Sequence, residues 1–283
     1  MMPRRFLSFF GMLSLVVAAP AGQALAACPT GLDTHAMASP GQLVMATNPS
    51  LPPLQYMRID GHLHGMRIEL GTEIARRLCL RPTYISTAFS TMILGLLERR
   101  WDVVDTGMFY KHERARMLEL IPYEIQSISV SMADTDTHHV SNIMDMAGMA
   151  VGVELGGFEE QRTRDIDRQL RAAGHKGLEI HTFDDFSVAF MALRAGQVAA
   201  VTSIDAVATR MAQEGGLHPA LSGLFPTPVV LAVHDHALAM AITTVLNDMR
   251  IDGTLERIMQ PYGIHPPPGE IRLYGPQTDA TNP

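Results

Sequence analysis

The sequence is poor in lysine and in cysteine, with two residues of each in a chain of 283. Its formal charge is −7, and loss of residues 1–26, which hold Arg4 and Arg5 but no acid, would shift it by two units to −9. Nucleic-acid binding requires a basic surface that neutralises phosphates. The acidic balance therefore excludes nucleic acid as an expected partner.

Long apolar runs are also absent, apart from a short one at the N-terminus from Phe6 to Val17. Arg4 and Arg5 precede this run, and the small residues 24–26, ALA, follow it. A positive start, a short apolar stretch and an A-x-A sequence are typical of a secretory signal peptide. We therefore expect residues 1–26 to be removed on export, and the mature chain to reside in the periplasm without a membrane span.

The two cysteines leave three alternatives open. In an oxidising compartment, Cys28 and Cys79 would form a disulfide that joins the N-terminus to the end of the first helix. Residues 25–28, LAAC, are also similar to a lipobox, in which Cys28 would carry a lipid anchor. In the third alternative both thiols stay free, and Cys79 packs as a small hydrophobic residue.

Strand-like and helix-like segments alternate along the chain, whose composition of 47% hydrophobic and 18% charged residues is that of a globular protein. Residues 42–47, 82–87 and 101–107 read as strands. Apolar residues at helical spacing between 66 and 80 and again between 89 and 100 predict the intervening helices. The pattern restarts near residue 146. This alternation predicts an α/β fold with mostly parallel sheets flanked by helices.

Two such halves joined by extended segments predict two lobes with a ligand cleft between them. The apolar segments 127–132 and 226–231 are expected to form a two-stranded hinge. Lobe 1 would comprise residues 41–126 and 232–264, and lobe 2 residues 133–225. Residues 48–56 are expected to form a proline-broken loop, and residues 265–283 a surface tail.

Five stretches, in order, give the sequence a resemblance to a known family: residues 60–78, 89–108, 107–114, 146–157 and 247–263. They resemble the periplasmic substrate-binding proteins of ABC transporters, solute-binding family 3, of the polar amino-acid-binding type. The resemblance implies a two-lobed, flytrap-like monomer. It would close around a small carboxylate-bearing ligand, an amino acid or a related organic acid, and pass it to an ABC permease without cofactor or chemistry.

The segment GMFYKHER, residues 107–114, carries the strongest part of this resemblance. Arg114 stands where the family's arginine holds the ligand carboxylate, and a guanidinium offers two parallel donors to such a group. A surface ion pair with Glu113 or Glu119 is the alternative. Gly107 and Thr106 would present main-chain groups to the ligand, although Gly107 also suits an ordinary turn. Phe109 replaces a threonine of the family, which removes a hydroxyl contact and favours either a ligand with an apolar or aromatic portion or a cleft that the protein partly fills.

The resemblance assigns further ligand contacts on both lobes. Phe89 and Leu51 stand at aromatic positions of the family's site, with ordinary core packing as the alternative for each. Asn48 occupies a position that is often acidic, and would bond a ligand amide or amine. Gly157 and Phe158 begin a helix whose free N–H groups suit an anion.

The largest departure from the family concerns the aspartate that binds the ligand's ammonium group. Counting from Gly196 places it at Ile204, one residue before Asp205. Because neighbouring residues of a strand face opposite sides, Asp205 reaches the cleft only through a bulge. Otherwise no carboxylate of this strand meets the ligand's amine.

Two other classes of function remain open. Periplasmic cyclohexadienyl dehydratase-like enzymes are similar to this family and need a general acid in the cleft, for which Glu154 and His234 are the available residues. A receptor-like accessory protein of another periplasmic system is the second.

The histidine pairs are not expected to bind metal. His62 and His64, and the neighbours His138 and His139, lack a third and fourth ligand in the sequence. We therefore predict solvated loop histidines.

Overall fold

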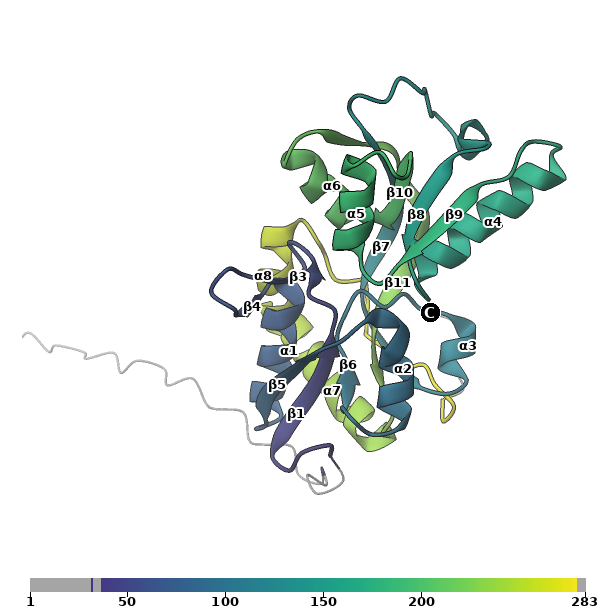
Figure 1. Cartoon of the computed structure of the whole chain (residues 1–283). Helices are drawn as coiled ribbons and strands as arrows, with labels where there is room; N and C mark the ends of the chain where they lie inside the picture. Colours follow the sequence, from purple (N-terminus) through teal and green to yellow (C-terminus); the bar gives the residue numbers. More distant parts are fainter. Residues whose placement is uncertain (1–31, 33–36, 279–283) are drawn as a thin grey trace, which may run out of the picture.

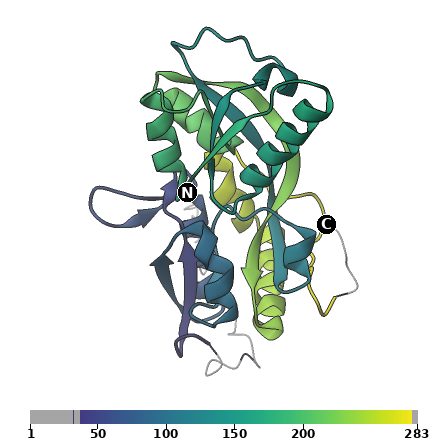
Figure 2. The same cartoon turned by 45° about the vertical axis from the view of Figure 1, so that its right-hand side comes forward.

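The computed structural model describes residue 32 and residues 37–278, which form two lobes (Figures 1 and 2). One mixed sheet of eight strands runs through both lobes in the order β5-β1-β6-β11-β7-β10-β8-β9. These strands are β1 (Gln42–Thr47), β5 (Arg81–Ser86), β6 (Val103–Val104), β7 (Glu119–Ala133), β8 (Ala150–Glu154), β9 (Glu179–Phe183), β10 (Ala200–Ile204) and β11 (Leu217–Val233). This is the two-lobe α/β architecture that the sequence predicts.

Each lobe contains three parallel strands, β5-β1-β6 in one and β10-β8-β9 in the other. Helices cover them on both faces (Figure 1). The helices are α1 (Met66–Arg77), α2 (Phe89–Leu97), α3 (His112–Ala115), α4 (Phe158–Ala172), α5 (Phe186–Arg194), α6 (Asp205–Gln213), α7 (His236–Ile251) and α8 (Thr254–Met259), with 3-10 turns η2 (Ile143–Met146) and η3 (Gln260–Tyr262).

The two longest strands, β7 and β11, connect the lobes. They pair antiparallel from Glu119 opposite Val233 to Ala133 opposite Leu217, with several register shifts. β7 also borders β10, and β11 borders β6, so the two parallel groups become one sheet. The segments 127–132 and 226–231 lie inside these strands, and their action as a hinge stays a prediction.

A small second sheet occupies the region expected to be a loop. It comprises β2 (Ser50–Leu51), β3 (Gln55–Met57) and β4 (Leu63–His64). The prolines at 52 and 53 lie in the turn between β2 and β3, which the Leu54 N–H closes by donating to the Leu51 carbonyl at 2.7 Å. Proline disrupts a ladder only where its missing N–H is needed, so strands form on either side.

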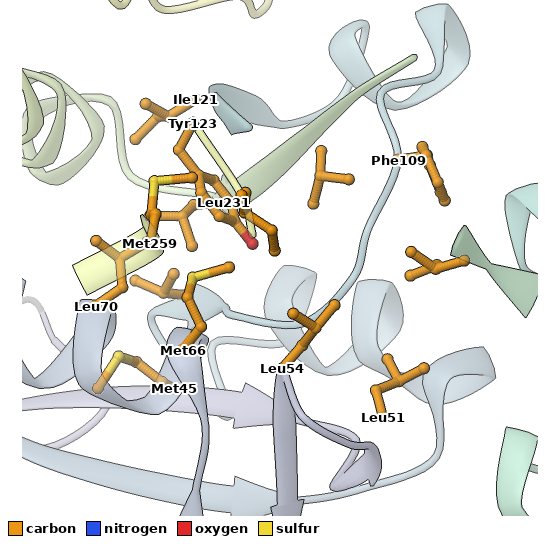
Figure 3. Close-up of a cluster of buried hydrophobic side chains, with 14 of the residues drawn as sticks. Met45, Leu51, Leu54, Met66, Leu70, Phe109, Ile121, Tyr123, Leu231 and Met259 are labelled. Carbon is orange, nitrogen blue, oxygen red and sulfur yellow. The ribbon is translucent and has the colours of Figure 1, made fainter. Parts of the chain in front are cut away.

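The apolar face of α1 packs into the core of the first lobe (Figure 3). Met66, Leu70 and Ile74, spaced at one helical turn, are at most 2% exposed. Gly65 precedes them with a φ of 118°, and a Cβ there would collide with the Leu54 carbonyl, so only glycine fits. This core continues to Leu51 and Phe109 without interruption, and therefore supports the predicted ligand segment directly.

Part of the predicted surface tail is buried. Ile271 and Leu273 are 4% and 7% exposed, and the Asn247 side chain bonds both the N–H and the carbonyl of Ile271. Tyr274 pairs with Leu120 of β7. Ile271 and Leu273 are apolar and explain this packing. The prediction of a surface tail rested on the prolines of the segment and did not take these residues into account.

The predictions for the N-terminus concern residues outside the described part of the chain. They concern the signal peptide, residues 1–26, and the pairing or lipidation of Cys28. Cys79 follows α1 and is disulfide-bonded. Within residues 37–278, none of the helices has the length and apolar character needed to cross a bilayer.

Candidate functional site

Arg114 is the charged centre of the junction between the lobes. It belongs to the short helix α3 and is 5% exposed. Its Nη1 donates to the Phe109 carbonyl at 2.7 Å, and its Nη2 to the Gly156 carbonyl of the second lobe at 3.4 Å. The guanidinium carbon lies 5.4 Å from the centre of the Phe89 ring. Burial lowers the Arg114 pKa to about 10, so the group remains cationic at neutral pH.

Phe109 and Phe158 stack across the lobes. Their ring centres are 4.5 Å apart at an interplanar angle of 28°. Phe109 is also bridged to Val229 of β11, which fixes its main chain beside Arg114. The two predicted contact residues thus form an apolar wall of the site.

Gly107 of the first lobe lies against Ile204 of the second. A Cβ at this position would be 2.7 Å from Cδ1 of Ile204 in the second lobe and 3.4 Å from Cδ1 of Leu51. A side chain there would require the Ile204 side chain to move, so glycine allows this close contact between the lobes. Ile204, at the end of β10, therefore faces the predicted ligand segment.

Asp205 is directed elsewhere. It begins α6 and accepts from the Ser129 hydroxyl at 2.5 Å and the Gly223 N–H at 3.1 Å. It also lines a separate cavity of about 640 Å³, together with Gln126 and Tyr262. Phe89 and Phe109 lie beside Arg114, and Phe158 stacks on Phe109, whereas the Asp205 carboxylate bonds other residues.

A buried polar network lies beneath the site. Arg67 is 0% exposed and forms an ion pair with Glu124. It also donates to the Tyr123 hydroxyl and to Oε1 of Gln55, each at 2.7 Å. The Gln55 amide in turn donates to the Thr106 hydroxyl at 2.7 Å. These bonds fix the orientation of the Thr106 side chain beside Gly107. In the sequence, the network is indicated by Arg67, a charged residue among the apolar residues of α1.

The second lobe contributes two buried carboxyl groups. Glu154 accepts from the Asn48 amide across the lobes at 2.6 Å, and burial raises its pKa well above the usual range. Glu159 in the first turn of α4 is 3% exposed, and burial raises its pKa to about 7. Lys111 of the first lobe donates to the Gly157 carbonyl at 3.2 Å, and burial lowers its pKa to about 8. Sequence reasoning missed Glu159 and Lys111.

Asp105, just before the segment of residues 107–114, has a buried carboxyl group without a hydrogen-bond partner in the described chain. It is 0% exposed, and neither carboxyl oxygen bonds to any group in the described chain. Burial raises its pKa from the ordinary 3.8 to about 7, and Arg67 opposes that shift in part. Because the native state binds this proton more tightly than the unfolded chain, Asp105 makes stability fall as pH rises from about 4 to 7.

We expect Asp105→Asn to raise the free energy of unfolding at pH 8 by about 1–3 kcal/mol, with no gain at pH 4. The free energy of unfolding should fall less steeply between pH 4 and pH 8 in this variant. A part of the fall should remain, because the Glu159 carboxyl contributes a pH dependence of the same sign. Urea unfolding at pH 4, 7 and 8 measures this. As a control, Asp102→Asn should destabilise, since Asp102 accepts from the Ala38 and Val44 N–H groups at 2.7 and 2.9 Å. An unchanged stability of Asp105→Asn at pH 8 would contradict the burial argument.

The two predicted histidine pairs lie at the surface. His62, His138 and His139 are exposed, and His64 is partly exposed. Within residues 37–278, no three His, Cys, Asp or Glu side chains are grouped so that they could hold a metal ion.

The fold and this junction define a class: a two-lobed α/β binding protein whose lobes are joined by two long strands. A model of the bacterial extracellular solute-binding proteins, family 3, matches residues 43–265. The chain belongs to this family.

Known relatives are distant. The L-cystine-binding protein TcyJ of Escherichia coli (strain K12) is 24% identical over 226 residues, which cover 78% of this chain and 82% of the relative. An ancestral arginine-binding protein bound to arginine is 27% identical, with a TM-score of 0.70 over 78% of this chain and 98% of that one. The ancestral amino acid-binding protein AncCDT-1, a precursor of cyclohexadienyl dehydratase, is 20% identical with a TM-score of 0.71 over 78% of this chain and 95% of that one, a likeness of fold.

Proposed function

We propose that this protein, once exported, captures a small carboxylate-bearing ligand between its lobes and delivers it to an ABC permease. The ligand would be an amino acid or a related organic acid. The burial of the Arg114 guanidinium is the observation on which the proposal rests. Arg114 is a buried cation whose described hydrogen bonds go to two main-chain carbonyls. A carboxylate would accept two parallel, charge-assisted bonds from the guanidinium and would compensate for its burial.

The contacts between the lobes support a ligand that bridges them. Asn48 bonds Glu154, Lys111 bonds the Gly157 carbonyl, and Arg114 bonds the Gly156 carbonyl. Each pair joins a residue of the first lobe to one of the second. A ligand that replaces such contacts on both sides would favour the closed arrangement over an open one, because it gains contacts only when the lobes meet.

The relatives support the chemical class. TcyJ is named for L-cystine, and the structure of the ancestral protein is described as bound to arginine. Both ligands carry an α-carboxylate. The apolar wall of Phe109 and Phe158 favours ligands whose remaining part presents carbon to these rings.

We expect an amino acid to raise the unfolding temperature of the protein by about 5–10 °C at a hundredfold excess over its dissociation constant. A thermal-shift screen with the twenty standard amino acids, L-cystine and a set of aliphatic and aromatic carboxylic acids measures this. Matched amines without a carboxylate serve as the control and should leave the unfolding temperature unchanged. A protein that responds to none of the acids would contradict the proposal.

One observation favours a second function, a dehydratase-like enzyme. Glu154 is 3% exposed, and burial raises its pKa, which favours the protonated form that a general acid requires. Turnover of prephenate or arogenate, lost in Glu154→Gln, would favour this enzyme over the binding protein. We expect no turnover.

A further inference from the structure

The residues of β10 and α6 offer no acid to a ligand held by Arg114. Ile204 presents an apolar side chain to Gly107, and the Asp205 carboxylate bonds Ser129 and the Gly223 N–H instead. An amino acid bound at Arg114 would still bring a buried ammonium group into the junction. Such a group needs an anionic or strongly polar partner.

Glu159 is an acid of the second lobe that lies at the junction. It belongs to the first turn of α4, and its Oε2 lies 2.8 Å from the position that a Cβ of Gly157 would occupy. The carboxylate therefore lies over the glycine turn that also accepts the bond from Lys111. Any side chain at position 157 would cover it.

The Glu159 carboxylate has a spare hydrogen-bonding capacity. The carboxylate accepts a hydrogen bond from the main-chain N–H of Glu159 itself. Within the described part of the chain, no side chain donates to it. By contrast, Glu160 is held by Arg164 and by the Gly156 N–H. An ionised carboxylate that is 3% exposed is costly to bury with one donor.

We propose that Glu159 accepts the ammonium group of an α-amino acid whose carboxylate is held by Arg114, an assignment that rests on the proposed function. The two charged ends of the ligand then contact opposite lobes, Arg114 on the first and Glu159 on the second. A zwitterion satisfies both buried groups at once, whereas a simple organic acid satisfies Arg114 alone. The ligand class is therefore narrowed to α-amino acids.

The charges around Glu159 give this assignment a pH dependence. Lys111, Arg114 and Arg67 of the first lobe favour its ionised form, while Glu154 beside it favours the neutral form. With burial, the pKa of Glu159 rises to about 7. An ammonium group favours the carboxylate, so affinity should increase as pH rises from about 6 to 8. Lys111, with its pKa lowered to about 8, loses charge near the upper end of this range.

The test compares Glu159→Gln with Glu179→Gln, which neutralises an exposed acid of the same lobe on β9. Calorimetric titration of the wild-type protein and both variants uses the twenty standard amino acids and L-cystine, together with the des-amino acid of each binder. We expect Glu159→Gln to weaken amino-acid binding at pH 8 at least about tenfold, to leave des-amino acids within about twofold, and to flatten the pH profile. Glu179→Gln should bind as the wild type does.

Each contrary outcome has a distinct meaning. Amino-acid affinity that is equal in Glu159→Gln and the wild type overturns this assignment and leaves the proposed function intact. An equal loss for amino acids and des-amino acids also overturns it, because the residue then acts on the site as a whole. A wild-type protein that binds none of the amino acids overturns this assignment, and the proposed function falls with it only if the carboxylic acids of the thermal-shift screen also fail to bind. The unfolding temperature of Glu159→Gln, expected to equal or exceed that of the wild type, excludes misfolding.

Discussion

The Arg114→Ala variant is expected to bind amino acids about 100- to 1,000-fold more weakly than the wild type. Each hydrogen bond to a charged group contributes about 1.5–3 kcal/mol, and a guanidinium makes two of them to one carboxylate. Arg114 is 5% exposed, so water replaces those bonds poorly once the ligand is inside. Isothermal titration with the amino acid that stabilises the wild type most measures the loss.

Two variants separate the role of this guanidinium from general effects of charge. Arg116→Ala removes an exposed arginine two residues away and should leave affinity unchanged. Arg114→Lys keeps a cation but loses the forked geometry, so its affinity should fall between those of Arg114→Ala and the wild type. Wild-type affinity in a folded Arg114→Ala protein would show that the carboxylate is held elsewhere.

The largest loss of stability is expected from Arg67→Met, at about 3–5 kcal/mol. Methionine fills much of the same space, but it leaves the Glu124 carboxylate without its cation in a position that is 0% exposed. Tyr123 and Gln55 lose a donor at the same time. Since Gln55 holds the Thr106 hydroxyl, ligand affinity should fall as well. Urea unfolding at pH 7 measures the first effect.

The exposed ion pair of Arg76 with Glu73 provides the matched control. Arg76 is 59% exposed, and Arg76→Met should change stability by about 0.5 kcal/mol or less. The double variant Arg67→Met with Glu124→Leu should recover much of the loss, because no unpaired charge remains. If Arg67→Met unfolds within about 1 kcal/mol of the wild type, the buried pair does not stabilise the fold as argued.

Local patterns in the sequence were sufficient to predict the two-lobed α/β fold. The alternation of strands and helices follows from apolar spacing, which each segment encodes by itself. The segment of residues 107–114 and the glycine turn before Phe158 were also recognisable, since each is a short local motif. The structure brings Arg114, Phe109 and Phe158 together where the lobes meet, although their role toward a ligand is still a prediction.

Contacts between distant residues could not be predicted in this way. Asn48 and Glu154 are separated by 106 positions, and the ion pair of Arg67 and Glu124 joins residues 57 positions apart. No periodicity indicates which polar residues will meet. For Asp205, the strand rule that neighbours face opposite sides gave two alternatives, and it could not show that the carboxylate bonds the Ser129 hydroxyl and the Gly223 N–H.

In the proposed complex, an amino acid lies between the lobes and is held by Arg114 and Glu159. A crystal structure of the protein with the amino acid that raises its unfolding temperature most tests this directly. We predict the ligand carboxylate within hydrogen-bond distance of both terminal nitrogens of Arg114, with its ammonium group at the Glu159 carboxylate. A ligand bound instead in the cavity lined by Asp205 and Tyr262, with Arg114 still bonded to the Phe109 and Gly156 carbonyls, would contradict it.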